Sequence, residues 1–180
     1  MREIEVKARV SNKPELQKQL TALGCVFSEP VSQRDRIFVP IGSSVPVNPG
    51  VNVLRIREQN GKYIFTLKQT IKNQLDCLER ELGIDNPEEL AEIFKLLGFF
   101  ESVGVNKQRQ KTKYKGLEIC LDSVEGLGDF IEVEKLSEAG DGDIVQAELF
   151  NFLQILGITK KDQVFEGYDV LAARKAGQPN

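Results

Sequence analysis

Residues 117–134 read LEICLDSVEGLGDFIEVE, the clearest alternating pattern in the chain. Apolar residues alternate with polar or charged ones on both sides of a glycine-containing turn, a pattern typical of two adjacent β-strands. Residues two apart in a strand share a face. Asp122 therefore lies opposite the aliphatic residues of the first run, and Glu132 and Glu134 lie opposite those of the second. The stretch predicts a hairpin with one apolar and one acidic face.

The same alternation recurs along most of the chain, interrupted by four helical segments. Each of the first three helical segments ends at a Leu-Gly pair, which marks a helix end. A loop rich in glycine and proline, residues 40–52, separates two strands and is expected to be mobile. We expect helices near 14–23, 87–97, 144–156 and 168–175, and strands near 2–10, 33–39, 52–58, 62–70, 75–83, 103–114, 117–123 and 129–135.

Charged residues gather on one face of strand after strand. If the amphipathic helices cover the apolar faces from outside, the charged faces point inward. The prediction is a single α+β domain over 1–180: a closed or nearly closed antiparallel β-barrel of about eight strands forming a charged tunnel, with the helices packed outside. The alternative is that each charged face is simply solvated. The inward acids would be Glu3, Glu5, Glu79, Glu81, Asp122, Glu132 and Glu134, and the inward bases Lys7, Arg55, Arg57, Lys68, Lys107, Arg109 and Lys111.

The amino-acid composition excludes several kinds of catalytic and metal-binding site. The 180 residues include no histidine and carry a net charge of −3. No histidine-based triad or histidine-ligated zinc is therefore available, and a metal must rest on carboxylates, which suits Mg²⁺ or Mn²⁺. An acidic chain is not expected to bind duplex nucleic acid. The N-terminus lacks the apolar core of a secretory signal, no apolar run has membrane-spanning length, and three scattered cysteines fit a reducing compartment, so we expect a cytoplasmic protein without membrane contact.

A tunnel with so many charges requires pairing, water or a charged ligand. A polyphosphate that carries a metal ion would contact side chains of both charges. Lysine and arginine would hold the phosphate oxygens, and carboxylates would hold the metal. A salt-bridged polar barrel with another role is the alternative. No glycine-rich phosphate loop is present, so side chains would make the cradle.

Taken together, these motifs resemble the CYTH superfamily, the triphosphate tunnel metalloenzymes. The resemblance covers nearly the whole chain and is most specific over 121–134. Ile37 departs from the pattern, because an aromatic residue is usual there. The matching segments are Glu3-Ile-Glu5-Val-Lys7, QRDRIF at 33–38, LRIR at 54–57, TLK at 66–68, ERE at 79–81, KQR at 107–109, 121–134, and GYDVL at 167–171.

The resemblance implies a role for each group of tunnel residues. Metal ligation falls to Glu3, Glu5, Asp122, Glu132 and Glu134. Phosphate binding falls to Lys7, Arg55, Arg57, Lys68, Lys107 and Arg109. The residues closest to catalysis would be Glu5, Lys7, Asp122 and Glu134. Glu79 and Glu81 would be secondary tunnel acids or plain partners of the arginines, and Tyr168 is expected to pack the last helix across the tunnel.

Within this superfamily the chain looks most like the class IV adenylate cyclases, which convert ATP to cyclic AMP and pyrophosphate. A triphosphatase acting on thiamine triphosphate, inorganic triphosphate or a nucleoside triphosphate is the first alternative. A binding module that sequesters an anionic metabolite without turnover is the second. The partner is then a triphosphate substrate, and a homodimer remains an open possibility.

Overall fold

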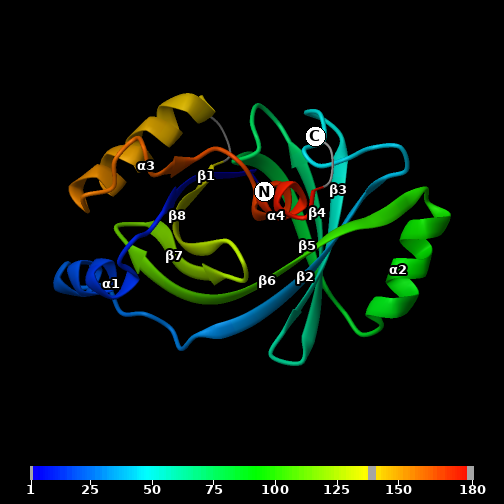
Figure 1. Ribbon diagram of the computed structural model, residues 1–180, viewed down its shortest axis with the longest axis horizontal. Coiled ribbons are helices and arrows are strands. Elements are labelled where there is room, and N and C mark those ends of the chain that lie inside the picture. Colours follow the sequence, from blue (N-terminus) through cyan, green and yellow to red (C-terminus); the bar gives the residue numbers. More distant parts are fainter. Residues whose placement is uncertain (1, 138–140, 178–180) are drawn as a thin grey trace.

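The computed structural model describes residues 2–137 and 141–177, and its centre is a closed β-barrel (Figure 1). The strands are β1 (Arg2–Arg9), β2 (Val31–Pro40), β3 (Asn52–Gln59), β4 (Lys62–Thr70), β5 (Asp76–Ile84), β6 (Phe99–Tyr114), β7 (Leu117–Val124), β8 (Gly128–Ser137) and β9 (Gln163–Val164). The helices are α1 (Lys13–Ala22), α2 (Pro87–Leu96), α3 (Gly142–Ile155) and α4 (Tyr168–Lys175).

Eight antiparallel strands close the barrel in the order β1-β8-β7-β6-β2-β3-β4-β5, and β5 pairs back onto β1. The predicted α+β tunnel architecture is confirmed. The structure adds β9, which pairs with Lys7 and Ala8 of β1 and is too short to leave an alternating signal. It also starts β6 at Phe99 rather than near residue 103, because β6 continues to pair with β2 up to Pro40.

Glycine allows the sharp β7–β8 turn that sets the register of this hairpin. Gly126 has a φ of +71° and Gly128 a φ of +101°, in the left-handed region that side chains disfavour. Glu125, in the same turn, accepts a hydrogen bond from Asn106 Nδ2 at 2.9 Å. The turn thus pairs β7 with β8 so that Glu118 lies opposite Glu134.

Helices start where the sequence places an asparagine before a proline-containing first turn. Asn12 accepts a hydrogen bond from the Glu15 amide at the start of α1, and Asn86 accepts one from the Glu89 amide at the start of α2. Each bond satisfies an amide that the helix itself cannot pair. Both helices then lay an apolar face on the barrel.

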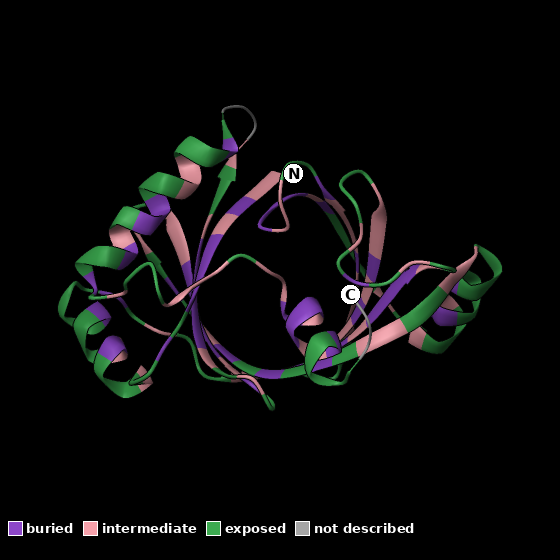
Figure 2. Ribbon diagram, turned by 45° about the horizontal axis from the view of Figure 1, so that its top comes forward, coloured by how far each residue is buried: buried purple, intermediate pink, exposed green. Residues whose placement is uncertain are grey.

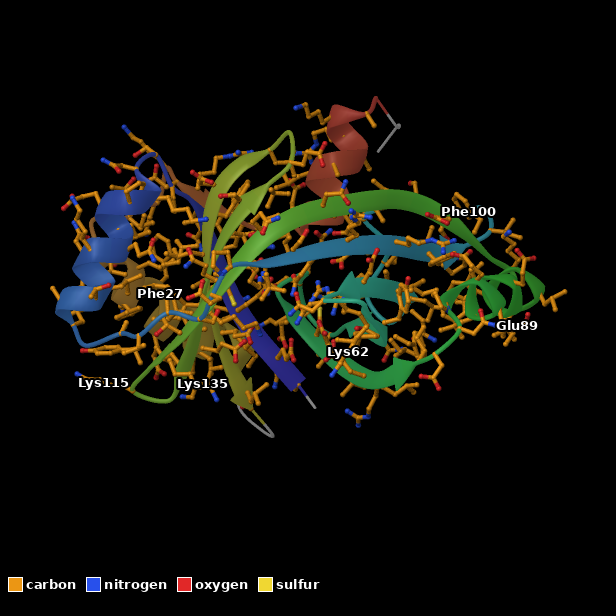
Figure 3. All side chains as sticks on the ribbon, turned by 90° about the horizontal axis from the view of Figure 1, so that it is seen from below. Phe27, Lys62, Glu89, Phe100, Lys115 and Lys135 are labelled. Carbon is orange, nitrogen blue, oxygen red and sulfur yellow. The ribbon has the colours of Figure 1, made fainter. Side chains whose placement is uncertain are left out.

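The apolar core lies outside the barrel wall, in separate packing regions. The largest joins α1 and α3 to the outer faces of β1, β7 and β8, and a second packs α2 against β2, β3 and β4. These regions lie at opposite ends of the molecule in Figure 3, where Glu89 and Phe100 mark the α2 end and Phe27 lies beside α1. Because helices cover these outer apolar faces, the barrel interior is left mainly to polar side chains, with a few apolar ones such as Val105 and Phe130 beneath α4.

The last helix, α4, lies across one opening of the barrel (Figure 2). Tyr168 and Leu171 pack with Phe130, while Val170 packs with Val45. The loop at 40–52 is therefore not a free surface loop throughout, because Val45 is buried against α4.

Cys25, Cys77 and Cys120 are all buried free thiols, as their scattered positions predicted. Within the described parts of the chain, no helix is long and apolar enough to cross a membrane.

Candidate functional site

One cavity of about 190 Å³ occupies the barrel interior, and charged side chains from seven strands line it. Every predicted phosphate-binding residue lines this cavity, as do all predicted acids except Asp122. The alternative that each charged strand face is simply solvated is therefore excluded. The prediction of one shared charged interior is confirmed.

Strand order sorts the charges into two regions. The three Glu-x-Glu strands β5, β1 and β8 are neighbours, and we call Glu3, Glu5, Glu79, Glu81, Glu132 and Glu134 the acidic arc. On the other side, β3 and β6 flank β2, and we call Arg55, Arg57, Lys107 and Arg109 the basic arc. Lys7 and Lys68 stand among the acids, on β1 and β4.

In the basic arc, Arg57 is held by a two-pronged ion pair with Asp35 of β2. The Arg57 Nε and Nη2 atoms donate to the two Asp35 oxygens at 2.7 and 2.6 Å. Burial opposes ionisation of Asp35, but the Arg57 hydrogen bonds outweigh it and lower the pKa of Asp35 to about 2. The Arg57 guanidinium is thus fixed in one orientation at the cavity wall.

Asp122 lies behind the cavity surface, where it fixes Arg109. Arg109 Nε donates to Asp122 at 2.7 Å, and Arg109 Nη2 contacts both Asp122 and Glu132. Tyr168 donates its hydroxyl to Asp122 at 2.9 Å, and Lys107 Nζ lies 3.4 Å away. Asp122 is fully buried, and these four contacts from three residues occupy its carboxylate oxygens.

Two lysines contact three acids of the arc. Lys7 Nζ lies 3.1 Å from Glu132 and 3.5 Å from Glu5, and Lys68 Nζ lies 3.1 Å from Glu79. Burial would raise the pKa of Glu132, but Arg109 and Lys7 hold it well below its usual range. The pKa of Glu79 is likewise lowered, against burial, by Lys68 and Arg55.

The remaining acids face one another. Strand pairing sets Glu118, Glu134 and Glu5 side by side on β7, β8 and β1, and we call these three the acidic row. Burial, followed by repulsion from Glu5 and Glu118, raises the pKa of Glu134 to about 9. Burial and Glu132 raise the pKa of Glu5, and burial and Glu79 raise that of Glu3 to about 7. Within residues 2–137 and 141–177, neither Glu3 nor Glu134 forms an ion pair.

The donor chemistry of Glu3, Glu5 and Glu134 fits a hard divalent cation. Like-charged carboxylates side by side on neighbouring strands destabilise a sheet, and a cation between them removes that cost. Mg²⁺ and Mn²⁺ favour carboxylate oxygens. The fit is poorer for Glu132 and Asp122, whose oxygens are already bonded to basic side chains.

Sequence reasoning did not assign roles to several residues of this interior. Asp35 and Glu118 were missed, and Cys120 was interpreted only as a small buried hydrophobe. Parity carried the signal, since Asp35 shares a face with Gln33 and Ile37, while Glu118 and Cys120 share one with Asp122. Tyr168 of α4 also reaches the cavity, where Lys7 Nζ lies 4.1 Å from its ring centroid.

Comparisons with known proteins agree with this architecture. The CYTH domain family model matches residues 1–168. A Methanocaldococcus jannaschii protein named "Putative adenylate cyclase MJ0240" is 32% identical over 171 residues, which cover 93% of this chain and 97% of that protein.

Solved structures of the same shape include the PH1012 protein of Pyrococcus horikoshii, 26% identical with a TM-score of 0.78, where the match covers 94% of this chain and 98% of that one. A Hippeastrum protein, described as an adenylyl cyclase candidate with a dominant triphosphatase activity, is 21% identical with a TM-score of 0.64. The match covers 100% of this chain and 98% of that one, and at this identity it supports the fold alone.

Proposed function

This chain belongs to the CYTH domain family, and on that premise we propose that it converts ATP to cyclic AMP and pyrophosphate with Mg²⁺ or Mn²⁺ in the barrel cavity. The observation that carries the proposal is the division of one cavity into a basic arc and an acidic arc. A ligand that combines phosphate oxygens with a divalent cation would contact the basic and the acidic region at the same time.

Size supports a triphosphate chain as the part of the ligand that enters. The cavity measures about 190 Å³, below the roughly 300–1,000 Å³ that holds a whole drug-sized ligand. The phosphates would occupy the charged interior, and the nucleoside would extend to the opening. Pro46 and Val47 of the loop at 40–52 and Val170 of α4 line the cavity on that side.

The basic side chains would hold and orient the triphosphate. Arg57 and Arg55 would meet phosphate oxygens from β3, while Lys107 and Arg109 would meet them from β6. Asp35 and Asp122 would fix two of these guanidinium groups, so that little reorganisation accompanies binding.

Glu3, Glu5 and Glu134 would hold the cation. When bound, Mg²⁺ or Mn²⁺ supplies charge stabilisation for the phosphate oxygens. The remaining task of the protein is alignment: the ribose 3′-oxygen attacks the α-phosphorus as its proton leaves, and pyrophosphate departs. Orientation of an intramolecular attack can contribute several kcal/mol, about 7 in well-aligned cases.

Product analysis tests the proposal. The protein is incubated with ATP, thiamine triphosphate or tripolyphosphate, each with Mg²⁺ or Mn²⁺, and the products are resolved. We expect cyclic AMP and pyrophosphate from ATP. ADP and phosphate from ATP, or hydrolysis of tripolyphosphate with ATP untouched, would assign the protein to the triphosphatases. Thermal stabilisation by triphosphate without any product would identify a binding module.

A further inference from the structure

A thiol lies beside the acidic row. Cys120 is on β7 with Glu118, and both face the barrel interior, whereas Ile119 and Leu121 face the helices. One carboxylate oxygen of Glu118, the Cys120 Sγ and one carboxylate oxygen of Glu134 all lie within 4.8 Å of one another.

We propose that Glu118, Cys120 and Glu134 form a second cation site, selective for thiophilic divalent ions such as Zn²⁺ or Cd²⁺. This site differs from the hard-cation position of Glu3 and Glu5 in its ligands and in its place, on the β7 side of Glu134. Thiolate ligands select soft or borderline metals, and Mg²⁺ does not seek sulfur.

The state of the Cys120 thiol is the independent support. Its side chain is fully buried, and no hydrogen bond to its Sγ is found among residues 2–137 and 141–177. Cys77 differs, because its Sγ donates to the Gln74 carbonyl oxygen at 3.3 Å. Cys120 is therefore a buried, unpartnered ligand atom aimed at two carboxylates.

Two carboxylates of the cluster, Glu118 and Glu134, face each other across β7 and β8, which favours a cation between them, although Glu118 already has a basic partner. Lys111 Nζ contacts Glu118, and Arg109 is already engaged by Asp122 and Glu132. A metal ion bound by Glu118 would therefore have to displace Lys111 from this carboxylate. A thiol binds metal as the thiolate, so a cation bound at this site would displace the proton of Cys120.

Geometry requires only a small adjustment. Zinc lies about 2.3 Å from sulfur and about 2.0–2.2 Å from oxygen, which sets tetrahedral ligand atoms about 3.5 Å apart. The cluster spans at most 4.8 Å, and rotation of the two glutamate side chains can close the difference. If Glu134 also serves the hard cation, as the proposed function holds, a thiophilic ion would withdraw it and inhibit turnover.

Cobalt(II) tests the site directly, without any activity measurement. Thiolate-bound Co²⁺ shows an intense near-ultraviolet charge-transfer band, whereas Co²⁺ bound by oxygens alone shows only weak visible bands. We expect the charge-transfer band on titrating the full chain with Co²⁺. Cys120→Ser should abolish the band and weaken Cd²⁺ binding at least about tenfold.

Cys77→Ser is the matched control, since it changes another buried thiol on a barrel strand and should leave the band intact. Glu118→Gln keeps all three thiols and should weaken the Co²⁺ affinity that the band reports. A band that survives Cys120→Ser, one that disappears in Cys77→Ser, or Co²⁺ binding without any charge-transfer band would each overturn the proposal.

Discussion

The basic arc and the acidic row occupy the same barrel but follow opposite electrostatic rules. Arg57 and Arg109 each have a dedicated carboxylate that holds them in a two-pronged ion pair. Glu134 has acids on both sides, Glu118 and Glu5. Lysines contact Glu118 and Glu5, but no ion pair is found for Glu134 among the described residues. The comparison indicates that the basic arc is preorganised, whereas a cation at Glu134 would relieve repulsion between neighbouring acids.

The largest difference should appear when one acid is neutralised in each region. Asp122→Asn leaves Arg109 and Lys107 buried with a weaker partner, and loss of one member of a buried ion pair costs about 3–5 kcal/mol. Glu134→Gln mimics the protonated carboxyl that a pKa of about 9 maintains at neutral pH, so the metal-free protein should be as stable or more stable. Urea unfolding at neutral pH measures both free energies.

Glu125→Gln is the control, because this exposed turn residue contributes no cavity charge. Glu134→Gln should also abolish turnover at ordinary Mg²⁺ concentrations, with partial recovery in excess Mn²⁺. Equal destabilisation by Asp122→Asn and Glu134→Gln would show that the two regions do not differ as described.

A second prediction concerns the basic arc alone. Arg57→Ala should weaken tripolyphosphate binding about 10- to 100-fold, since a hydrogen bond to a charged group contributes about 1.5–3 kcal/mol. Isothermal titration calorimetry in the presence of Mg²⁺ measures the affinity. Arg34→Ala, which removes an exposed arginine of β2 whose carboxylate partner is Glu58, should leave it unchanged. Equal affinity for both variants would remove Arg57 from the phosphate site.

The sequence was sufficient for the barrel and for which residues share its interior. Alternation along each strand places Arg55 and Arg57, or Glu132 and Glu134, on one face whatever the surrounding structure. Because three amphipathic helices required apolar surface, the charged faces had to turn inward. These inferences use only local periodicity, and the strands of the structure follow the same alternation.

Pairing between strands could not be predicted in this way. Which acid meets which base depends on strand order and register, and both depend on contacts distant in the sequence. Asp122 was expected among the metal ligands, yet it lies behind the cavity wall against Arg109. Glu118 lies beside Glu134 only because β7 pairs with β8 in this register. The strand register therefore determines that Arg57 and Arg109 each meet a carboxylate while Glu134 meets two other acids.

Two residues of the acidic arc, Glu3 and Glu134, also predict how stability changes with pH. Glu3 and Glu134 keep their protons up to pKa values of about 7 and about 9, whereas an unfolded glutamate releases its proton near the ordinary pKa of 4.5. The folded protein then binds more protons, so stability falls as pH rises. Lys107, whose pKa burial and Arg109 lower to about 8, acts oppositely above that pH.

Thermal unfolding of the metal-free protein should therefore show a melting temperature that decreases between about pH 5 and about pH 8. Glu134→Gln should flatten this dependence, and Mg²⁺ with tripolyphosphate should restore the melting temperature at the upper end. Lys18→Gln, which removes an exposed charge on α1, should leave the slope as it is. A slope that Glu134→Gln does not change would place the titration outside the acidic row.

The smallest effect is expected where α4 meets the basic arc. Tyr168→Phe removes the hydroxyl that donates to Asp122 but keeps the ring beside Lys7 and Lys107. Asp122 retains Arg109, so the loss should be about 1 kcal/mol, or about 2–4 °C in melting temperature. Turnover should fall less than about threefold, because a packing residue acts only through the position of Asp122. Proton transfer by Tyr168 would instead contribute about 10²–10⁴-fold, and a loss of that size, absent from Tyr114→Phe, would make the hydroxyl catalytic.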